Sequence, residues 1–94
     1  MRIARFAKRF RRDYAKAQRS GKNISKLDTV MHMLVDGVFL PSKYKDHALH
    51  GVWQDMRDCH IEGNWVLVYE LAISDDGSDI IIFHATDTHE NIFG

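Results

Sequence analysis

The apolar residues of this chain change their spacing near its middle, and that change limits the folds open to it. Between residues 6 and 19 they fall on one stripe of a helix, and between residues 24 and 34 they form a second stripe. Beyond residue 52 they are largely β-branched and aromatic and occur in short runs separated by turn residues. Helices followed by hairpins predict an α+β fold, in which the helices pack on one face of a small antiparallel β-sheet.

Turn residues set the expected boundaries of these elements. Gly21 and Gly37 end the two expected helices, of which the first covers 6–19 and the second begins after Asn23. Because only a short turn joins them, the helices should form an antiparallel hairpin. The expected strands are 2–5 at an edge, 52–61, 65–71 in the centre and 79–84, with a polar loop over 42–50. A chain of 94 residues has room for one core, which predicts a single domain over 1–94.

A net charge of zero conceals a strong division of charge along the chain. Residues 1–45 hold 12 Lys and Arg against 3 acidic residues, a net charge of +9, and residues 46–94 hold 1 against 10, a net charge of −9. Part of the positive charge lies on the polar side of the first helix, at Arg9, Arg12 and Lys16. This basic face predicts contact with a polyanion such as RNA. A solvated helix without a partner is the alternative.

Three observations exclude other classes of protein. No apolar run approaches the roughly 18 to 20 residues of a membrane-spanning helix. The first residues lack the apolar region of a secretory signal. Cys59 is the only cysteine, so no intramolecular disulfide can form. We therefore expect a cytoplasmic protein without membrane contact.

Five of the six histidines lie in the acidic half, where they could transfer protons near neutral pH. His47 lies in the polar loop beside two lysines, whose point charges suit phosphate. Strand alternation places Asp58 and His60 on one face, where the carboxylate could orient the imidazole, and His89 follows the last strand. Each feature alone also fits an exposed histidine or a surface ion pair. The candidate catalytic and phosphate-binding residues are His47, His60, His89, Asp58, Lys43 and Lys45.

Metal ligation is the other use of histidine that the spacing allows. His47 and His50 are three residues apart, and His84 and His89 are five apart. The chain has no second cysteine and no His-Glu-x-x-His helix, and Lys45 would repel a dication beside the first pair. We therefore expect no metal and no cofactor.

Four motifs follow one another along the second half of the chain. They are Lys45-Asp46-His47-x-Leu49-x-Gly51-x-Trp53, Arg57-Asp58-x-His60, Trp65-x-Leu67-x-Tyr69 and Thr86-x-Thr88-His89-x-x-x-Phe93-Gly94. In this order and spacing they resemble the YafQ branch of the RelE-like toxins, the ribonuclease members of bacterial toxin–antitoxin pairs. The resemblance covers nearly the whole chain, including the two N-terminal helices.

The resemblance implies an activity, partners and roles for individual residues. Members of this family cleave messenger RNA on the ribosome without a metal, by attack of a ribose 2′-hydroxyl on the adjacent phosphorus. The implied cognate partner is a small antitoxin protein, in a toxin–antitoxin complex of higher order. By position, the resemblance makes His47, His60 and His89 catalytic, and it makes Trp65 and Phe93 RNA contacts.

Two positions depart from the family pattern. Asn64 replaces an aspartate of the catalytic set, and its amide can form hydrogen bonds but cannot titrate. Ala85 replaces an arginine that would stabilise negative charge in the transition state. The cations that could take over that role are His84, Lys43, Lys45 and Arg57. Two hypotheses follow: an active mRNA interferase, or a catalytically weakened toxin fold that binds its antitoxin or RNA.

Overall fold

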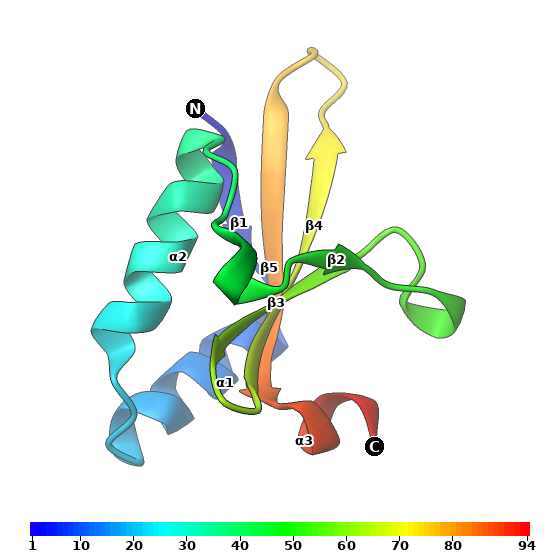
Figure 1. Ribbon diagram of the computed structural model, residues 1–94. Helices are drawn as coiled ribbons and strands as arrows, with labels where there is room; N and C mark the ends of the chain where they lie inside the picture. The colour runs from blue at the N-terminus through cyan, green and yellow to red at the C-terminus, as the bar shows by residue number, and fades with distance from the viewer.

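The computed structural model describes all of residues 1–94 and places two N-terminal helices against one twisted β-sheet (Figure 1). The elements are β1 (Ile3–Phe6), α1 (Lys8–Arg19), α2 (Ile24–Asp36), β2 (His47–Ala48), β3 (Arg57–Glu62), β4 (Trp65–Ile73), β5 (Asp79–Thr88) and α3 (His89–Phe93). Short 3₁₀ turns at Ser42–Tyr44 and Gly51–Trp53 lie between α2 and β3. The expected α+β class is confirmed. None of the helices is long and apolar enough to cross a membrane.

The sheet has the strand order β1-β5-β4-β3-β2 and is mixed rather than purely antiparallel. Strands β3 to β5 pair antiparallel, as predicted, but β1 lies parallel to β5 at the edge. The short antiparallel strand β2 lies in the segment that was expected to be a loop. A tight turn fixes the antiparallel direction of β5 relative to β4, whereas two helices separate β1 from the other strands and leave its direction open. The main-chain N–H of Arg2 donates to the carbonyl of Val35 at 2.7 Å, which ties the start of β1 to the end of α2.

The helix boundaries follow the turn residues closely. Helix α1 begins at Lys8 rather than at residue 6, because Phe6 belongs to β1. Gly37 ends α2 in the left-handed conformation, with a φ of 78°, as its position predicts. Asn23 precedes α2 as expected, although its side chain makes no capping hydrogen bond.

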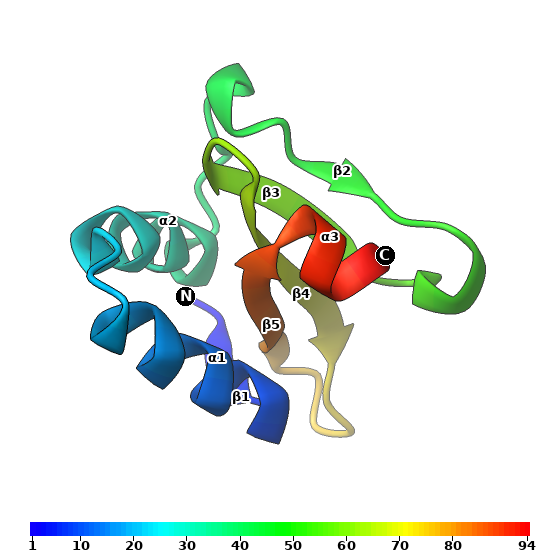
Figure 2. The same ribbon diagram turned by 90° about the horizontal axis from the view of Figure 1, so that it is seen from below.

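Helices α1 and α2 cover the same face of the sheet (Figure 2) but diverge from the turn between them (Figure 1). The hydroxyl of Tyr14 donates to the carboxylate of Asp28 at 2.8 Å and links the two helices. An apolar cavity of about 460 Å³ opens beside this contact, between Phe10 on α1 and Met31 on α2. A short turn joins the two helices as expected, but they do not pack along each other as an antiparallel hairpin. Each helix packs on the sheet instead.

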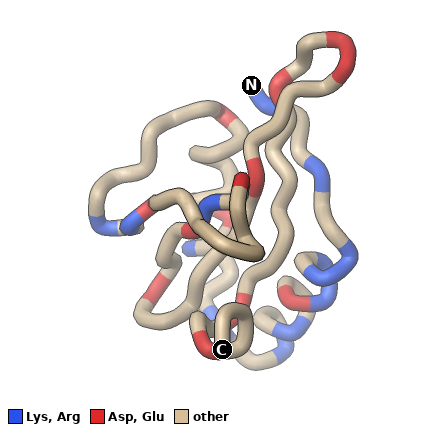
Figure 3. Tube along the Cα trace, turned by 90° about the vertical axis from the view of Figure 1, so that its right-hand side faces the viewer, with Lys and Arg blue, Asp and Glu red and all other residues tan.

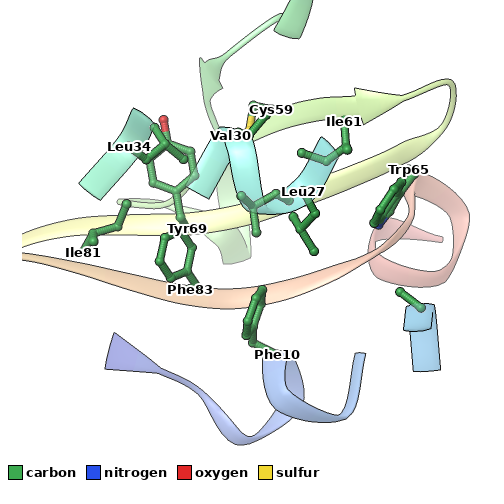
Figure 4. Close-up of a cluster of buried hydrophobic side chains, with 12 residues drawn as sticks. Phe10, Leu27, Val30, Leu34, Cys59, Ile61, Trp65, Tyr69, Ile81 and Phe83 are labelled. Atoms are coloured by element: carbon green, nitrogen blue, oxygen red, sulfur yellow. The ribbon is translucent and has the colours of Figure 1, made fainter. Parts of the chain in front are cut away.

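The main core lies between these helices and the sheet (Figure 4). Its buried members are Phe10, Ala17, Leu27, Val30, Leu34, Cys59, Ile61, Trp65, Leu67, Tyr69, Ile81 and Phe83. The ring of Phe83 lies 5.7 Å from that of Phe6 and 5.6 Å from that of Phe10, measured between ring centres. The apolar stripes of both helices and alternate residues of three strands meet here, which explains why both periods are visible in the sequence.

Two strand boundaries differ from the expected ones by more than two residues. The strand expected over 52–61 begins only at Arg57, because Gly51–Trp53 forms a 3₁₀ turn and Asp55 adopts a positive φ of 74°. Strand β5 runs beyond residue 84 to Thr88, since it keeps pairing with β4 to the far end of that strand.

A smaller apolar cluster lies on the opposite face of the sheet. Its buried members are Val66, Val68, Ala85 and Ile92, and Leu49, Trp53, Met56 and Phe93 pack against them. Both faces of β4 are therefore covered, as its apolar sequence predicts for a central strand. This second cluster forms the floor of the candidate site.

Candidate active site

Three of the predicted histidines gather around one buried carboxylate, on the face of the sheet opposite α1 and α2. Alternation along β3 turns Cys59 toward the main core and leaves Asp58 and His60 on the other face, as predicted. His47 lies directly opposite Asp58 in the β2–β3 ladder. His60 lies two residues from Asp58 on the same face, and the ring of His89 packs on Phe93, which belongs to the apolar cluster of that face, so the four side chains share one face of the sheet.

Asp58 is the buried centre of this group. Its side chain is 1% exposed, and Oδ1 lies 3.3 Å from Nδ1 of His47. That contact does not have hydrogen-bond geometry, and no other group donates to this oxygen. Burial raises the pKa of Asp58, and this effect outweighs the neighbouring imidazoles, which act to lower it. Oδ1 of Asp58 is therefore a buried acceptor that is open to a donor.

Main-chain carbonyl groups lie next to a ring nitrogen in two of these histidines and so determine which nitrogen carries the proton. Nδ1 of His47 lies 2.7 Å from the carbonyl oxygen of Lys45, and Nδ1 of His60 lies 3.4 Å from that of Gly63. Because a carbonyl oxygen only accepts, we assign the proton to Nδ1 in both rings. The second ring nitrogen, Nε2, is then the one that can exchange a proton with a ligand.

His89 reaches the site from the first residue of α3. Its main-chain N–H donates to the carbonyl of Asn64 at 2.8 Å, and the Asn64 side chain donates to Glu90 at 3.1 Å. Thr88 caps the same helix by accepting the N–H of Asn91. Asn64 therefore anchors α3 to the β3–β4 turn. An aspartate at position 64 would instead face the Glu90 carboxylate.

Two aromatic rings border the imidazoles. The ring centre of Phe93 lies 4.8 Å from that of His89 and 5.3 Å from that of Trp53, which it meets edge-on. Phe93 and Trp53 are both half-buried, so part of each ring remains open to a ligand. Phe93 lies beside the site, where sequence reasoning expected an RNA contact. Trp53 was not among the predicted site residues, because the motif that contains it does not reveal which ring it meets.

Trp65 does not reach the site, so its predicted contact with RNA is corrected. Its side chain is 2% exposed and lies in the main core, under the helices. The indole N–H donates to the hydroxyl of Thr86 at 2.9 Å, and the ammonium of Lys22 lies 5.3 Å from the centre of the ring. An RNA base cannot stack on a ring that is covered in this way.

The basic residues of α1 lie beside α3, at the lower right of Figure 3. Arg9 donates to the main-chain carbonyl of Asn91 at 3.4 Å, and the ammonium of Lys16 lies 3.6 Å from the carboxylate of Asp87. Arg12 is exposed and forms no ion pair. The basic face predicted from the sequence is thus continuous with the helix that carries His89, although part of its charge is engaged by acidic side chains.

Neither a metal site nor a reactive cysteine lies beside these residues. No three side chains of His, Cys, Asp or Glu are placed to share a metal ion. Cys59 lies on the core side of β3, where burial raises the pKa of its thiol, so it does not join the site.

Comparison with known proteins identifies the family to which the chain belongs. The family model for the bacterial toxin YafQ of type II toxin–antitoxin systems matches residues 2–94. The chain belongs to the YafQ family.

Individual YafQ proteins resemble the chain over almost their full length. The mRNA interferase toxin YafQ of Escherichia coli strain K12 is 34% identical over 90 residues, which cover 95% of this chain and 92% of that protein. The crystal structure of YafQ from E. coli strain BL21(DE3) matches with a TM-score of 0.90 and 33% identity over 100% of both chains. A structure of the E. coli DinJ–YafQ complex matches with a TM-score of 0.88 and 34% identity, again over 100% of both chains.

Ala85, where the resemblance led us to expect an arginine, lies in the floor of the site. It is 1% exposed and is itself a buried member of the second cluster. Two of the cations that could replace the arginine are engaged elsewhere. Nε2 of His84 lies 2.9 Å from the Glu70 carboxylate, and the Arg57 guanidinium lies 3.4 Å from that of Asp46.

Lys43 and Lys45 are the remaining candidates to replace the family arginine. Both are exposed in the loop that carries His47, and neither forms an ion pair. The ammonium of Lys43 lies over the Tyr44 ring, 5.1 Å from its centre. These two lysines are therefore the free cations closest in sequence to His47.

Proposed function

We propose that this member of the YafQ family is an endoribonuclease toxin that cleaves messenger RNA on the ribosome and is neutralised by a cognate antitoxin. One observation carries the proposal: His47 lies 3.3 Å from the buried Asp58, and His60 and His89 lie on the same face of the sheet. Cleavage of RNA by its own 2′-hydroxyl needs a base and an acid in one site, and imidazoles supply both. The similarity to the E. coli mRNA interferase toxin supports the same activity.

The proposed reaction is a transesterification within the RNA strand. Nε2 of one histidine removes the proton of a ribose 2′-hydroxyl, and the oxygen bonds to the adjacent phosphorus. The bond from phosphorus to the 5′-oxygen breaks, and a protonated imidazole gives its proton to that oxygen. The products are a 2′,3′-cyclic phosphate and a 5′-hydroxyl, and no metal ion takes part. Asp58 stabilises the imidazolium that forms after proton removal.

Other residues of the site and of α1 would bind the RNA. Lys43 and Lys45 supply charge for phosphates near the imidazoles, and Phe93 offers a partly open ring for stacking on an unpaired base. The basic residues of α1 provide sequence-independent contacts to ribosomal RNA.

A small antitoxin is the proposed protein partner. The E. coli relative occurs in a DinJ–YafQ complex, and this chain covers the whole length of the YafQ protein in it. We expect the cognate antitoxin to bind this chain and to form an assembly with more than one copy of each protein.

Induction of this chain without an antitoxin tests the function directly. Growth should arrest, and primer extension on a translated messenger RNA should reveal new 5′ ends that untranslated RNA lacks. Cleavage by purified components should persist when transition metals are chelated and magnesium is kept for the ribosomes. Growth arrest without new RNA ends would contradict cleavage, and strict dependence on added zinc or manganese would contradict the metal-free mechanism.

Restoring the family arginine should increase cleavage. A well-aimed donor to a developing oxyanion contributes about 10²–10³ in rate, and Ala85→Arg should recover less, ~10-fold, because the surrounding apolar cluster is not shaped for it. The measurement is the cleavage rate at equal concentrations of folded protein. Ala85→Met is the matched control, since it fills similar space without a charge.

Equal rates for the Arg and Met variants would show that another cation already serves the phosphate, with Lys45 the first to remove. The second candidate function, a weakened toxin fold that binds its antitoxin or RNA without cleaving, is favoured by Ala85 and Asn64, the two departures from the family pattern. Wild-type protein that cleaves no RNA, together with an Ala85→Arg variant that does, would support that second function.

A further inference from the structure

A polar cluster of three side chains lies directly behind His47, on the face of the sheet that the helices cover. The hydroxyl of Tyr69 donates to Oδ1 of Asp46 at 2.6 Å. The guanidinium of Arg57 donates to both oxygens of the same carboxylate, each at 3.4 Å. Tyr69 is 1% exposed and comes from the middle of β4, whereas Asp46 belongs to the loop that carries the histidine.

Strand alternation explains how this cluster acts on the site. Asp46 and His47 are neighbours in the chain, so their side chains point to opposite faces of the sheet. In the ladder His47 lies opposite Asp58, and Ala48 lies opposite Arg57. The loop is therefore held on one face by the contact of the imidazole with Asp58 and on the other face by Asp46.

The main-chain pairing of this segment is too short to position an imidazole alone. Strand β2 has two residues, and a 3₁₀ turn lies on each side of it, at Ser42–Tyr44 and Gly51–Trp53. The carbonyl that fixes Nδ1 of His47 belongs to Lys45, which immediately precedes Asp46. Any movement of Asp46 thus displaces both the ring and the acceptor that sets its tautomer.

The hydroxyl of Tyr69 makes its hydrogen bond with the loop and not with another residue of the core. Figure 4 shows the ring among the buried side chains and its oxygen pointing away from the sheet. Burial and the hydrogen bond to Asp46 raise the pKa of Tyr69, so the hydroxyl keeps the proton that it donates. A phenylalanine would fill the same volume, and only the contact with the loop requires tyrosine.

We propose that Tyr69 and Arg57 are positioning residues, which hold Asp46 and thereby fix the place and the tautomer of His47. The inference rests on the proposed function for its effect on the reaction, but the geometry of His47 can be measured without RNA. The cluster is the counterpart, on the covered face, of the contact between His47 and Asp58.

Tyr69→Phe tests this role, and Tyr14→Phe is its matched control. Each variant loses one hydroxyl that donates to a carboxylate, at 2.6 Å in the first and at 2.8 Å in the second. A cavity of about 350 Å³ opens on Asp46, so the carboxylate freed by Tyr69→Phe can bind water and the fold should survive. Tyr14 links α1 to α2, away from the histidines.

Two measurements distinguish positioning from general stability. In the imidazole ¹⁵N spectrum, Tyr69→Phe should change His47 from one tautomer to a mixture and leave His60 unchanged. The kcat for RNA cleavage should fall ~10- to 100-fold with KM nearly constant, because misplaced catalytic groups cost rate rather than binding. Tyr14→Phe should leave both the spectrum and kcat as in the wild type.

Three results would overturn the proposal. They are an unchanged His47 spectrum in folded Tyr69→Phe, an unchanged kcat, or equal losses of kcat in the two tyrosine variants. If Tyr69→Phe does not fold, Asp46→Ala in the exposed loop is measured in the same way and should give the same two changes. A wild-type protein that cleaves no RNA contradicts the proposed function, while the ¹⁵N comparison still decides whether Tyr69 positions His47.

Discussion

Replacing Asp58 by Asn should give a protein that cleaves RNA at least about 100-fold more slowly and yet resists unfolding better at neutral pH. Cleavage falls because the amide cannot stabilise a positive charge on the surrounding imidazoles. Stability rises because the ionised carboxylate is buried with one oxygen that accepts no hydrogen bond, whereas the amide carries no charge. The measurements are the cleavage rate and urea unfolding of the two proteins.

The gain in stability should depend on pH in a defined direction. Folding raises the pKa of Asp58 above its unfolded value of about 3.9, so the folded state binds more protons between the two values. The free energy of unfolding of the wild type therefore falls as the pH rises through this interval. That of the Asn variant does not, because an amide does not titrate. The difference between the proteins should be small below the unfolded pKa and largest above the folded one.

Asp75→Asn supplies the control, because it removes one exposed acidic group in the β4–β5 turn. It should change neither cleavage nor the pH dependence of unfolding appreciably. An Asp58→Asn protein that unfolds more easily than the wild type at neutral pH would show that the carboxylate stabilises the fold. The buried charge would then not lower the stability of the folded protein.

Removing the imidazole of His89 should nearly abolish cleavage, by about 10²–10⁴-fold, the contribution expected of a positioned acid or base. The side chain is exposed, so His89→Ala should fold normally. His32→Ala is the matched control, since His32 is exposed on α2 and belongs to no candidate site. The cleavage rate at saturating RNA is the quantity to compare.

A loss smaller than about 10-fold in His89→Ala would place both proton transfers on His47 and His60. Those two rings share a feature that His89 lacks, a main-chain carbonyl next to Nδ1. The result would therefore also show whether this orientation is what distinguishes the catalytic imidazoles.

Features that depend on local periodicity could be predicted from the sequence. Helical spacing located α1 and α2, and alternation along β3 correctly placed Asp58 and His60 on one face. Glycine marked the end of α2 because only its backbone adopts the required φ easily. The motifs also placed His47 and His89 in one functional group, and the structure places both on the face of the sheet that carries Asp58.

Features that depend on pairing between distant segments could not be predicted in this way. Trp65 was expected at the RNA, but both alternating sets of residues over 65–69 are apolar, so periodicity there cannot tell which face the helices cover. The parallel direction of β1 follows from tertiary packing and leaves no local pattern. The contact between Tyr69 and Asp46 joins the centre of a strand to a loop, and neither residue alone indicates the other.

The pairing of β1 with β5 has a consequence for the synthesis of the protein. Ile3 lies opposite Ile80, so the edge of the sheet cannot close until most of the chain has left the ribosome. Pairings between segments so far apart close large loops and form late in folding. Until then, the apolar sides of α1 and α2 have no sheet to cover them. A nascent chain is therefore without its histidine site and rich in exposed apolar surface, and the toxin becomes complete only when its last strand is made.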